Sequence, residues 1–194
     1  MAADLTAHLR ELSQAAALAA DALGPSIDKA ASLVRATVQG GGTLFFCGNG
    51  GSAADAQHMA TEYTVRYLRR RRALAAIALT TDTSALTAIG NDFSFDEVFS
   101  RQVEALCRPG DLLILHTTSG KSPNLLRAAD AARAKGALTL ALSAKGGGPL
   151  AAVVDHCVVV PVDRTDRAQE IQLCISHAIC DLIDHETALA EGTV

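Results

Sequence analysis

The chain has 194 residues, enough for one domain whose core is stable without disulfide or metal cross-links. Hydrophobic residues make up 49% of it and charged residues 20%, which excludes a largely disordered protein. Lysine and arginine number 17 against 21 acidic residues, and the net charge of -4 argues against general electrostatic binding to nucleic acid or acidic lipid. Composition therefore favours a folded protein that acts on a small ligand.

Sequence features also bear on the cellular compartment. The N-terminal sequence contains acidic residues and no apolar signal region, and no stretch reaches the roughly 18 to 20 apolar residues of a membrane span. The five cysteines form no CxxC pair, which disfavours a disulfide framework and a zinc ribbon. We therefore expect a cytoplasmic protein without membrane contact, whose cysteines are buried and reduced.

Two amphipathic helices are predicted at the start of the chain. Apolar residues recur at intervals of three and four from Leu5 to Ala19 and again from Ile27 to Val38. Gly24-Pro25 separates the two patterns and predicts a break between them.

Short apolar runs then alternate with segments of helical period. Continuous apolar runs are typical of parallel strands that are covered on both faces. The predicted strands are residues 43–47, 74–79, 112–115, 138–142 and 157–160, and the predicted helices include 103–106, 125–134 and 166–189. This β-α-β order predicts one α/β domain with helices on both faces of a parallel sheet, and ligands are then expected beyond the carboxyl ends of the strands.

The first loop at that edge is rich in glycine. Gly48-Asn49-Gly50-Gly51-Ser52 allows backbone amides to approach an anion, and Ser52 with Asp55 has the spacing of a capping box for a helix beginning at Ala53. The loop also fits the dinucleotide fingerprint GxGxxG/A, with Arg69 to Arg72 about 20 residues further on. These arginines precede the second strand instead of following it, which disfavours NADP binding and favours a solvated loop.

The second loop, Thr117-Thr118-Ser119-Gly120-Lys121-Ser122, is rich in hydroxyls. Its end resembles a P-loop, but the glycine that a P-loop requires five positions before Gly120 is Leu115 here. Hydroxyls, a lysine and a helix N-terminus at Pro123 remain, and they suit either a phosphate monoester or an ordinary capped turn. Two polar loops at one sheet edge favour ligand binding.

Potential metal ligands occur at helical spacing in two places. His58 and Glu62 lie four residues apart after the first loop, and Gln169 and His177 lie on one stripe of the last helix. Taken alone, the first pair is also typical of a surface ion pair and the second of an exposed face. Together they offer two imidazoles, a carboxylate and an amide oxygen, which zinc or another divalent metal accepts if the helices meet within one chain or across subunits.

The ordered motifs resemble those of the phosphoheptose isomerases, in the sugar isomerase (SIS) domain superfamily. The resemblance spans almost the whole chain, through residues 47–62, Gly90-Asn91-Asp92, 118–122 and 166–177. It implies a flavodoxin-like three-layer α/β/α sandwich with a central parallel sheet. A single SIS domain is then expected over residues 1–194, with an N-terminal helical extension in 1–40 and the α/β core in 43–194.

The resemblance further implies conversion of sedoheptulose 7-phosphate into D-glycero-D-manno-heptose 7-phosphate by a homotetramer with active sites at subunit interfaces. The family's metal ligands, usually of Zn²⁺, match His58, Glu62, Gln169 and His177. The catalytic acid/base pair matches Glu62 and His177. Substrate-binding or neighbouring polar positions match Asn49, Gly50, Gly51, Ser52, Glu62, Arg66, Asn91, Asp92, Thr117, Thr118, Ser119, Ser122, Asp166 and Gln169.

This chain departs from the family at two places. Thr117 stands where a serine is frequent, and residues 69–72 lack the expected proline-containing turn. Thr117 keeps the hydroxyl, and neither departure changes a residue matched to the metal ligands or to the acid/base pair.

Other functions within the superfamily stay open. One relative is a replication-initiator-associating protein that binds a protein partner, and others act on different sugar phosphates. The binding protein lacks the acid and the imidazole at the positions of Glu62 and His177, and this chain has both. The sequence therefore predicts an aldose-ketose isomerase that works through a metal-assisted enediolate.

Overall fold

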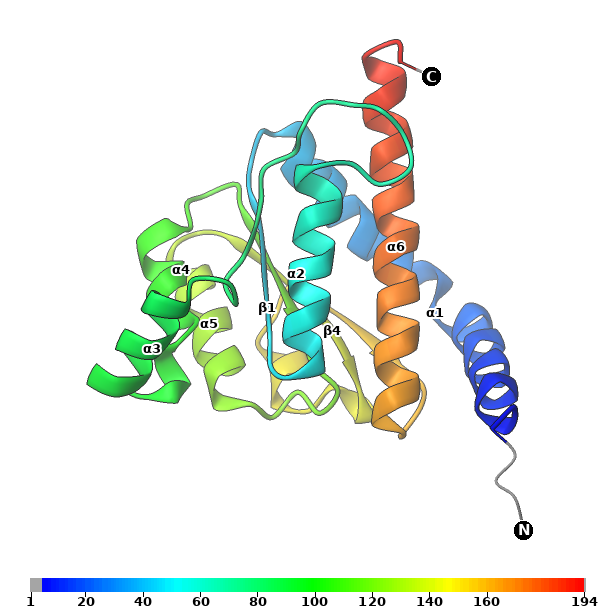
Figure 1. The fold of residues 1–194 in the computed structure, drawn as a ribbon, viewed down its shortest axis with the longest axis horizontal. Helices are drawn as coiled ribbons and strands as arrows, with labels where there is room; N and C mark the ends of the chain where they lie inside the picture. Colours follow the sequence, from blue (N-terminus) through cyan, green and yellow to red (C-terminus); the bar gives the residue numbers. More distant parts are fainter. Residues whose placement is uncertain (1–4, 194) are drawn as a thin grey trace.

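Five short strands form one parallel sheet in the computed structural model, which describes residues 5–193 (Figure 1). The strands are β1 (Leu44–Gly48), β2 (Ala76–Ala78), β3 (Leu112–His116), β4 (Leu138–Ala144) and β5 (His156–Val160). Their order is β2-β1-β3-β4-β5, and every neighbouring pair is parallel. This is the flavodoxin-like order, in which the direction of winding reverses between β1 and β3.

Helices cover both faces of the sheet and complete the three predicted layers. One face packs against α1 (Ala7–Gln39), α2 (Gly51–Thr64) and α6 (Thr165–Ala190). The other packs against α3 (Thr83–Asp92), α4 (Ser100–Leu106) and α5 (Pro123–Ala134). Short 3-10 turns lie at Phe95–Glu97, Lys145–Gly147 and Pro149–Ala152. The predicted α/β sandwich is confirmed.

Side-chain alternation along the strands explains why both layers are apolar. In β1, Leu44 and Phe46 belong to the core under α1, α2 and α6, while Phe45 and Cys47 belong to the core under α4 and α5. Within residues 5–193, no helix combines the length and the apolar character that a membrane crossing requires.

The predicted break in the N-terminal region is wrong. Residues Ala7–Gln39 form one helix with Pro25 inside it, and Figure 1 shows this helix changing direction along its course. A proline removes one backbone donor and bends a helix without necessarily ending it. Buried residues on both sides of Pro25, among them Leu23 and Ala30, pack into the same core, so burial holds the two halves in one helix.

Helix α3 was not predicted from the sequence. Its start is marked by Asp82, whose side chain accepts a hydrogen bond from the backbone N–H of Ala85 at 2.9 Å, as an N-cap does.

The expectation that all cysteines are buried needs correction. All five cysteines are free thiols, but Cys174 is exposed on α6 and Cys157 is half-buried. The spacing between cysteines in the sequence does not show which of them is exposed, and Cys174 is exposed to solvent on its helix.

Candidate active site

The two polar loops meet at the carboxyl edge of the sheet, as predicted. Gly48 at the end of β1 is in register with His116 at the end of β3, so the loops that follow start side by side. Asn49 and Asn124 exchange two amide hydrogen bonds, of 2.9 and 2.8 Å, across the gap. The loops therefore form one continuous polar surface at the point where the sheet's winding reverses, which is where ligands bind in such folds.

The first loop enters α2 differently from the prediction. Helix α2 begins at Gly51, and its N-cap is Gly50, with φ of 58°. Ser52 is therefore inside the first turn and makes no capping box with Asp55. A Cβ at Gly48 would lie 2.5 Å from the Ser52 carbonyl oxygen, so the close turn requires glycine there.

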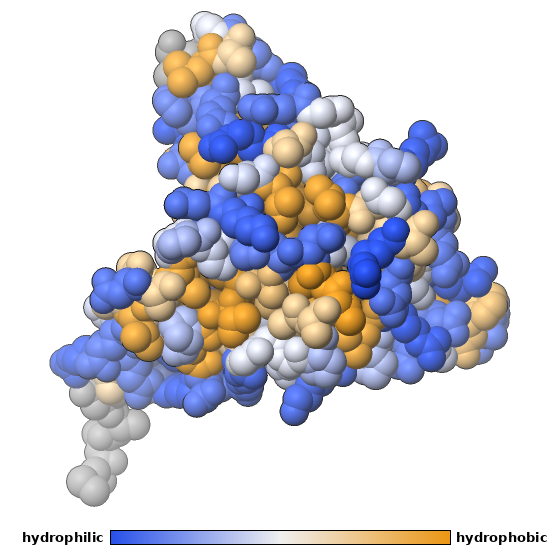
Figure 2. Space-filling view, turned by 180° about the vertical axis from the view of Figure 1, so that it is seen from behind, coloured by the Kyte–Doolittle hydropathy of each residue, from blue (hydrophilic) through white to orange (hydrophobic). Residues whose placement is uncertain are grey.

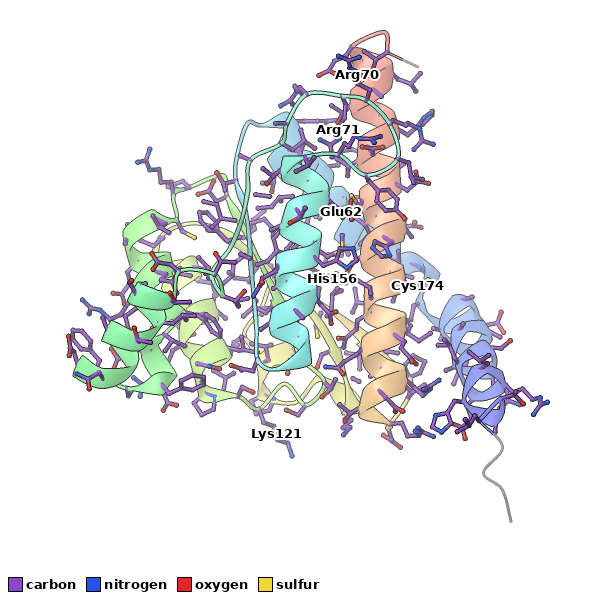
Figure 3. All side chains as sticks on the ribbon, in the orientation of Figure 1. Glu62, Arg70, Arg71, Lys121, His156 and Cys174 are labelled. Carbon is purple, nitrogen blue, oxygen red and sulfur yellow. The ribbon has the colours of Figure 1, made fainter. Side chains whose placement is uncertain are left out.

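The second loop gathers hydroxyls and amides at the start of α5. The Thr117 hydroxyl accepts from the Gly120 N–H at 3.2 Å, and the Ser119 hydroxyl accepts from the Lys121 N–H at 3.3 Å. Ser122 is the N-cap of α5, but its hydroxyl makes no cap hydrogen bond and stays available. Lys121 points outward at the lower edge of the molecule in Figure 3. The loop has the donors that a phosphate monoester needs.

Replacing Gly120 by alanine should disrupt this loop. Gly120 has φ of +62°, and an added Cβ would lie 1.8 Å from the Gly147 carbonyl oxygen. We expect a loss of roughly 1 to 3 kcal/mol in unfolding free energy from the backbone conformation alone, together with weaker binding of sugar phosphates. Thermal unfolding and calorimetric titration measure the two effects. Gly24→Ala is the control, because no atom lies within 4 Å of its added Cβ, and equal behaviour of the two variants would contradict the account.

Three potential metal ligands converge between α2 and α6. The ligand atoms of His58, Glu62 and His177 all lie within 4.8 Å of one another. His58 Nε2 is 3.1 Å from a Glu62 carboxylate oxygen and 3.4 Å from His177 Nε2. The helices lie side by side with Glu62 on α2 (Figure 3). The predicted meeting of the two helices is therefore observed within one chain.

The environment of this cluster favours a neutral imidazole at His177. Partial burial, and then the neighbouring His58, lower the pKa of His177 from its ordinary value, although Glu62 and Asp55 oppose the shift. Burial also raises the pKa of Asp55. A neutral imidazole keeps the lone pair that a metal ligand or a proton acceptor requires.

Gln169 contacts the start of α2 in this structure. Its side-chain amide is 3.5 Å from the Ser52 hydroxyl, and a Cβ on Gly51 would meet its Nε2 at 2.8 Å. It is eight residues, or roughly 12 Å of helix, from His177. Gln169 thus joins the glycine-rich loop to α6, and its role as a fourth ligand stays a prediction.

Four other predicted site residues are not brought to the cluster. Asn91 and Asp92 end α3, where their exposed side chains bond to each other at 2.8 Å. Asp166 is paired with Arg164, which holds the pKa of that carboxyl below its usual range. Arg66 is exposed after α2. Among residues 5–193, no hydrogen bond or ion pair links any of the four to the three-residue cluster.

Sequence reasoning missed two buried polar residues beneath the second loop. His116 is 1% exposed, and burial lowers its pKa to about 4, so it is uncharged at neutral pH. Gln172 donates from its side-chain amide to the Thr117 carbonyl at 2.7 Å. In the described part of the chain, neither His116 ring nitrogen has a hydrogen-bond partner. A histidine ending an apolar strand is the only signal that the sequence offered.

Comparison with known proteins decides the family. Residues 7–144 match the family model described as "SIS domain". A phosphoheptose isomerase of Rhodospirillum rubrum is 50% identical over 160 residues, 82% of this chain and 85% of that protein. This chain belongs to the phosphoheptose isomerase family.

Solved structures agree with that assignment. A phosphoheptose isomerase from Neisseria gonorrhoeae aligns with a TM-score of 0.88 and 46% identity, over 93% of this chain and 97% of the other. One from Francisella tularensis aligns with a TM-score of 0.90 and 35% identity, over 93% and 96%. Phosphoheptose isomerases therefore share both the fold and much of the sequence with this chain.

Proposed function

We propose that this enzyme interconverts sedoheptulose 7-phosphate and D-glycero-D-manno-heptose 7-phosphate with the help of a divalent metal. The observation that carries the proposal is the convergence of His58, Glu62 and His177 in a member of the phosphoheptose isomerase family. Stoichiometric metal in the purified protein and a thermal shift on adding the heptose phosphate test it. A non-catalytic binding module would show neither.

The cluster fits a metal ion on its own chemistry. Two imidazole nitrogens and a carboxylate oxygen within 4.8 Å match the nitrogen and oxygen ligands that zinc takes in catalytic sites. Gln169 is our candidate for the fourth ligand, which requires its side chain to turn from Ser52 toward the cluster. A metal bound there supplies Lewis-acid polarisation of the sugar's carbonyl and hydroxyl oxygens.

The reaction itself requires two proton-transfer groups. A proton leaves C1 of the ketose and is delivered to C2, through an enediolate whose negative charge must be stabilised. We assign Glu62 to removal of the carbon-bound proton, because it is the carboxylate of the three-residue cluster and a carboxylate can act as a general base. We assign His177 to the oxygen or the opposite carbon, because an imidazole can both accept and donate a proton.

The second loop is our proposed site for the substrate's phosphate. Ser119 and Ser122, with nearby backbone amides, offer hydrogen bonds to its oxygens. Replacing each serine by alanine should weaken binding of phosphorylated ketoses by roughly 1 to 3 kcal/mol per lost bond. Isothermal titration measures this change, with the exposed Ser32→Ala on α1 as control. Unchanged affinity in both loop variants would move the phosphate elsewhere.

We also propose a homotetramer whose subunits complete one another's sites. The glycine-rich loop enters α2 at Gly51, whereas Glu62 lies eleven residues, or roughly 16 Å, further along that helix. We infer that the glycine-rich loop of a second subunit lies closer to Glu62 than the loop of the same chain does. Figure 2 shows hydrophobic side chains in patches on the molecular surface, and exposed apolar residues include Leu9, Leu18 and Leu189. A cytoplasmic location is proposed because all five cysteines are free thiols.

A further inference from the structure

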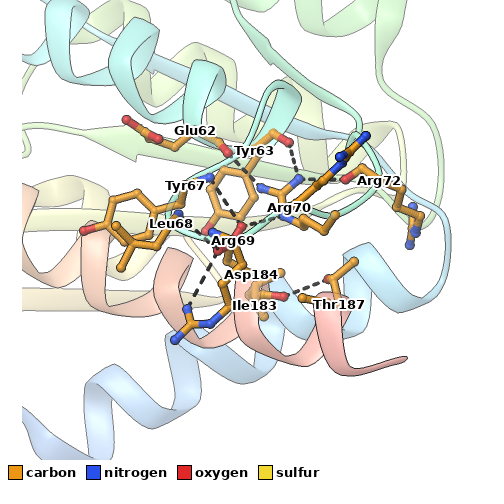
Figure 4. A network of polar contacts seen from close by, with 12 residues as sticks. Glu62, Tyr63, Tyr67, Leu68, Arg69, Arg70, Arg72, Ile183, Asp184 and Thr187 are labelled. Carbon is orange, nitrogen blue, oxygen red and sulfur yellow. Dashed lines mark hydrogen bonds and ion pairs between the residues drawn. The ribbon is translucent and has the colours of Figure 1, made fainter. Parts of the chain in front are cut away.

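Residues 66–72 form a strap that runs from the end of α2 across α6 (Figure 4). Sequence reasoning favoured a solvated loop for its arginines. The Asp184 side chain on α6 is instead fully buried, and its carboxylate accepts three consecutive backbone N–H groups. These belong to Tyr67, Leu68 and Arg69, at 3.3, 3.1 and 2.7 Å. The strap is therefore fixed to α6 through its backbone.

Arg71 fastens the same strap to α2. Its side chain is fully buried, and its Nε donates to Asp184 at 2.8 Å. Its terminal nitrogens donate to the carbonyl oxygens of Glu62 at 2.8 Å and Tyr63 at 3.0 Å. These carbonyls belong to the last turn of α2, which lacks intrahelical donors and favours positive charge. One buried ion pair thus joins the two helices that carry the metal-binding cluster.

The strap places an aromatic ring directly on that cluster. The Tyr67 ring stacks on the His177 imidazole, with centroids 5.4 Å apart and planes 16° apart. The His58 ring meets His177 edge-on at 5.0 Å. The imidazole of His177 is therefore enclosed by one stacked ring and one perpendicular ring, which restricts rotation about its side-chain bonds.

We propose that Tyr67 is a positioning residue for the isomerase reaction: its ring fixes the plane of the His177 imidazole beside His58 and Glu62. This inference rests on the proposed function, since His177 acts through metal binding and proton transfer. A ligand that is already oriented loses less freedom when it binds metal, and supporting groups of this kind alter metal affinity or activity by about 10- to 100-fold. Among residues 5–193, no hydrogen bond or ring contact joins Tyr67 to the second loop, residues 117–122, where we place the substrate's phosphate.

Two substitutions separate the ring from the hydroxyl. Tyr67→Leu removes the ring at a half-buried position, and Tyr67→Phe keeps it. Phe95→Leu, which removes a ring that is 66% exposed on the opposite helical layer, is the matched control. For each variant we would measure Zn²⁺ affinity of the metal-free protein by chelator competition, the ring-current shift of the His177 protons by NMR, and kcat and KM for sedoheptulose 7-phosphate.

We expect Tyr67→Leu to lose the ring-current shift and to lower Zn²⁺ affinity and kcat by about 10- to 100-fold, with KM unchanged. Tyr67→Phe and Phe95→Leu should match the parent protein. Parent-like Zn²⁺ affinity and kcat in Tyr67→Leu would overturn the proposal, as would equal losses in Tyr67→Phe. If the parent protein binds Zn²⁺ but does not isomerise the sugar, the proposed function fails, while Zn²⁺ affinity and the NMR shift still decide the role of Tyr67.

Discussion

Glu62→Gln should lower turnover of sedoheptulose 7-phosphate by roughly two to four orders of magnitude, the contribution of a general acid or base. Glutamine keeps the size and an amide oxygen but cannot accept a proton at neutral pH. Solvent deuterium incorporation into the substrate should fall equally, because removal of the carbon-bound proton starts both processes. The control is Glu104→Gln, at an exposed acid on α4. Near-normal turnover in Glu62→Gln would end the assignment.

His177→Gln should lose turnover to a similar extent, and its exchange behaviour locates its step. If His177 acts only in the second proton transfer, deuterium still enters the substrate while product formation stops. If it also orients the metal for the first step, both are lost. Either result supports a role in catalysis, and parent-like turnover would refute it. His8→Gln, at an exposed histidine on α1, controls for loss of an imidazole as such.

Arg71→Met should destabilise the fold by about 3 to 5 kcal/mol, because it leaves the Asp184 carboxylate buried without its counter-charge. Two carbonyls at the end of α2 also lose their donor. Urea unfolding of the metal-free protein measures the change. Arg72→Met is the matched control, since that side chain is 57% exposed and its contact with Glu191 is 3.6 Å long. Equal stability of the two variants would show that the buried pair contributes nothing.

Periodicity was sufficient to predict the sheet and most of its helices. The central strands β1 and β3 are buried at every residue and therefore read as continuous apolar runs, as in Leu112–His116. The edge strand β2 is still apolar in sequence, although Ile77 on it is exposed. The break at Pro25 was mispredicted because packing on both sides of the proline, which local sequence does not show, keeps α1 continuous. The start of α2 was displaced because Gly50, through its backbone conformation, takes the cap position expected of Ser52.

The site could be predicted only where helical spacing and motif order carried it. His58 and Glu62 share a helix face by their spacing, and the structure adds that His177 meets them. The environment of the arginine run could not be predicted, because the buried Arg71 side chain is paired with Asp184, which lies 113 residues away in the chain. Tyr67 was missed for the same reason: its stacking on His177 depends on that distant carboxylate.

Incubation of the metal-loaded enzyme with sedoheptulose 7-phosphate in D₂O, followed by NMR, tests the central claim most directly. A proton-transfer isomerase should form D-glycero-D-manno-heptose 7-phosphate that carries deuterium at C2, because the enediolate takes its new proton at C2 from a group in exchange with solvent. Deuterium should also enter C1 of the remaining ketose as the reaction reverses. Neither product nor deuterium at either carbon, from enzyme shown to contain metal, would contradict the account.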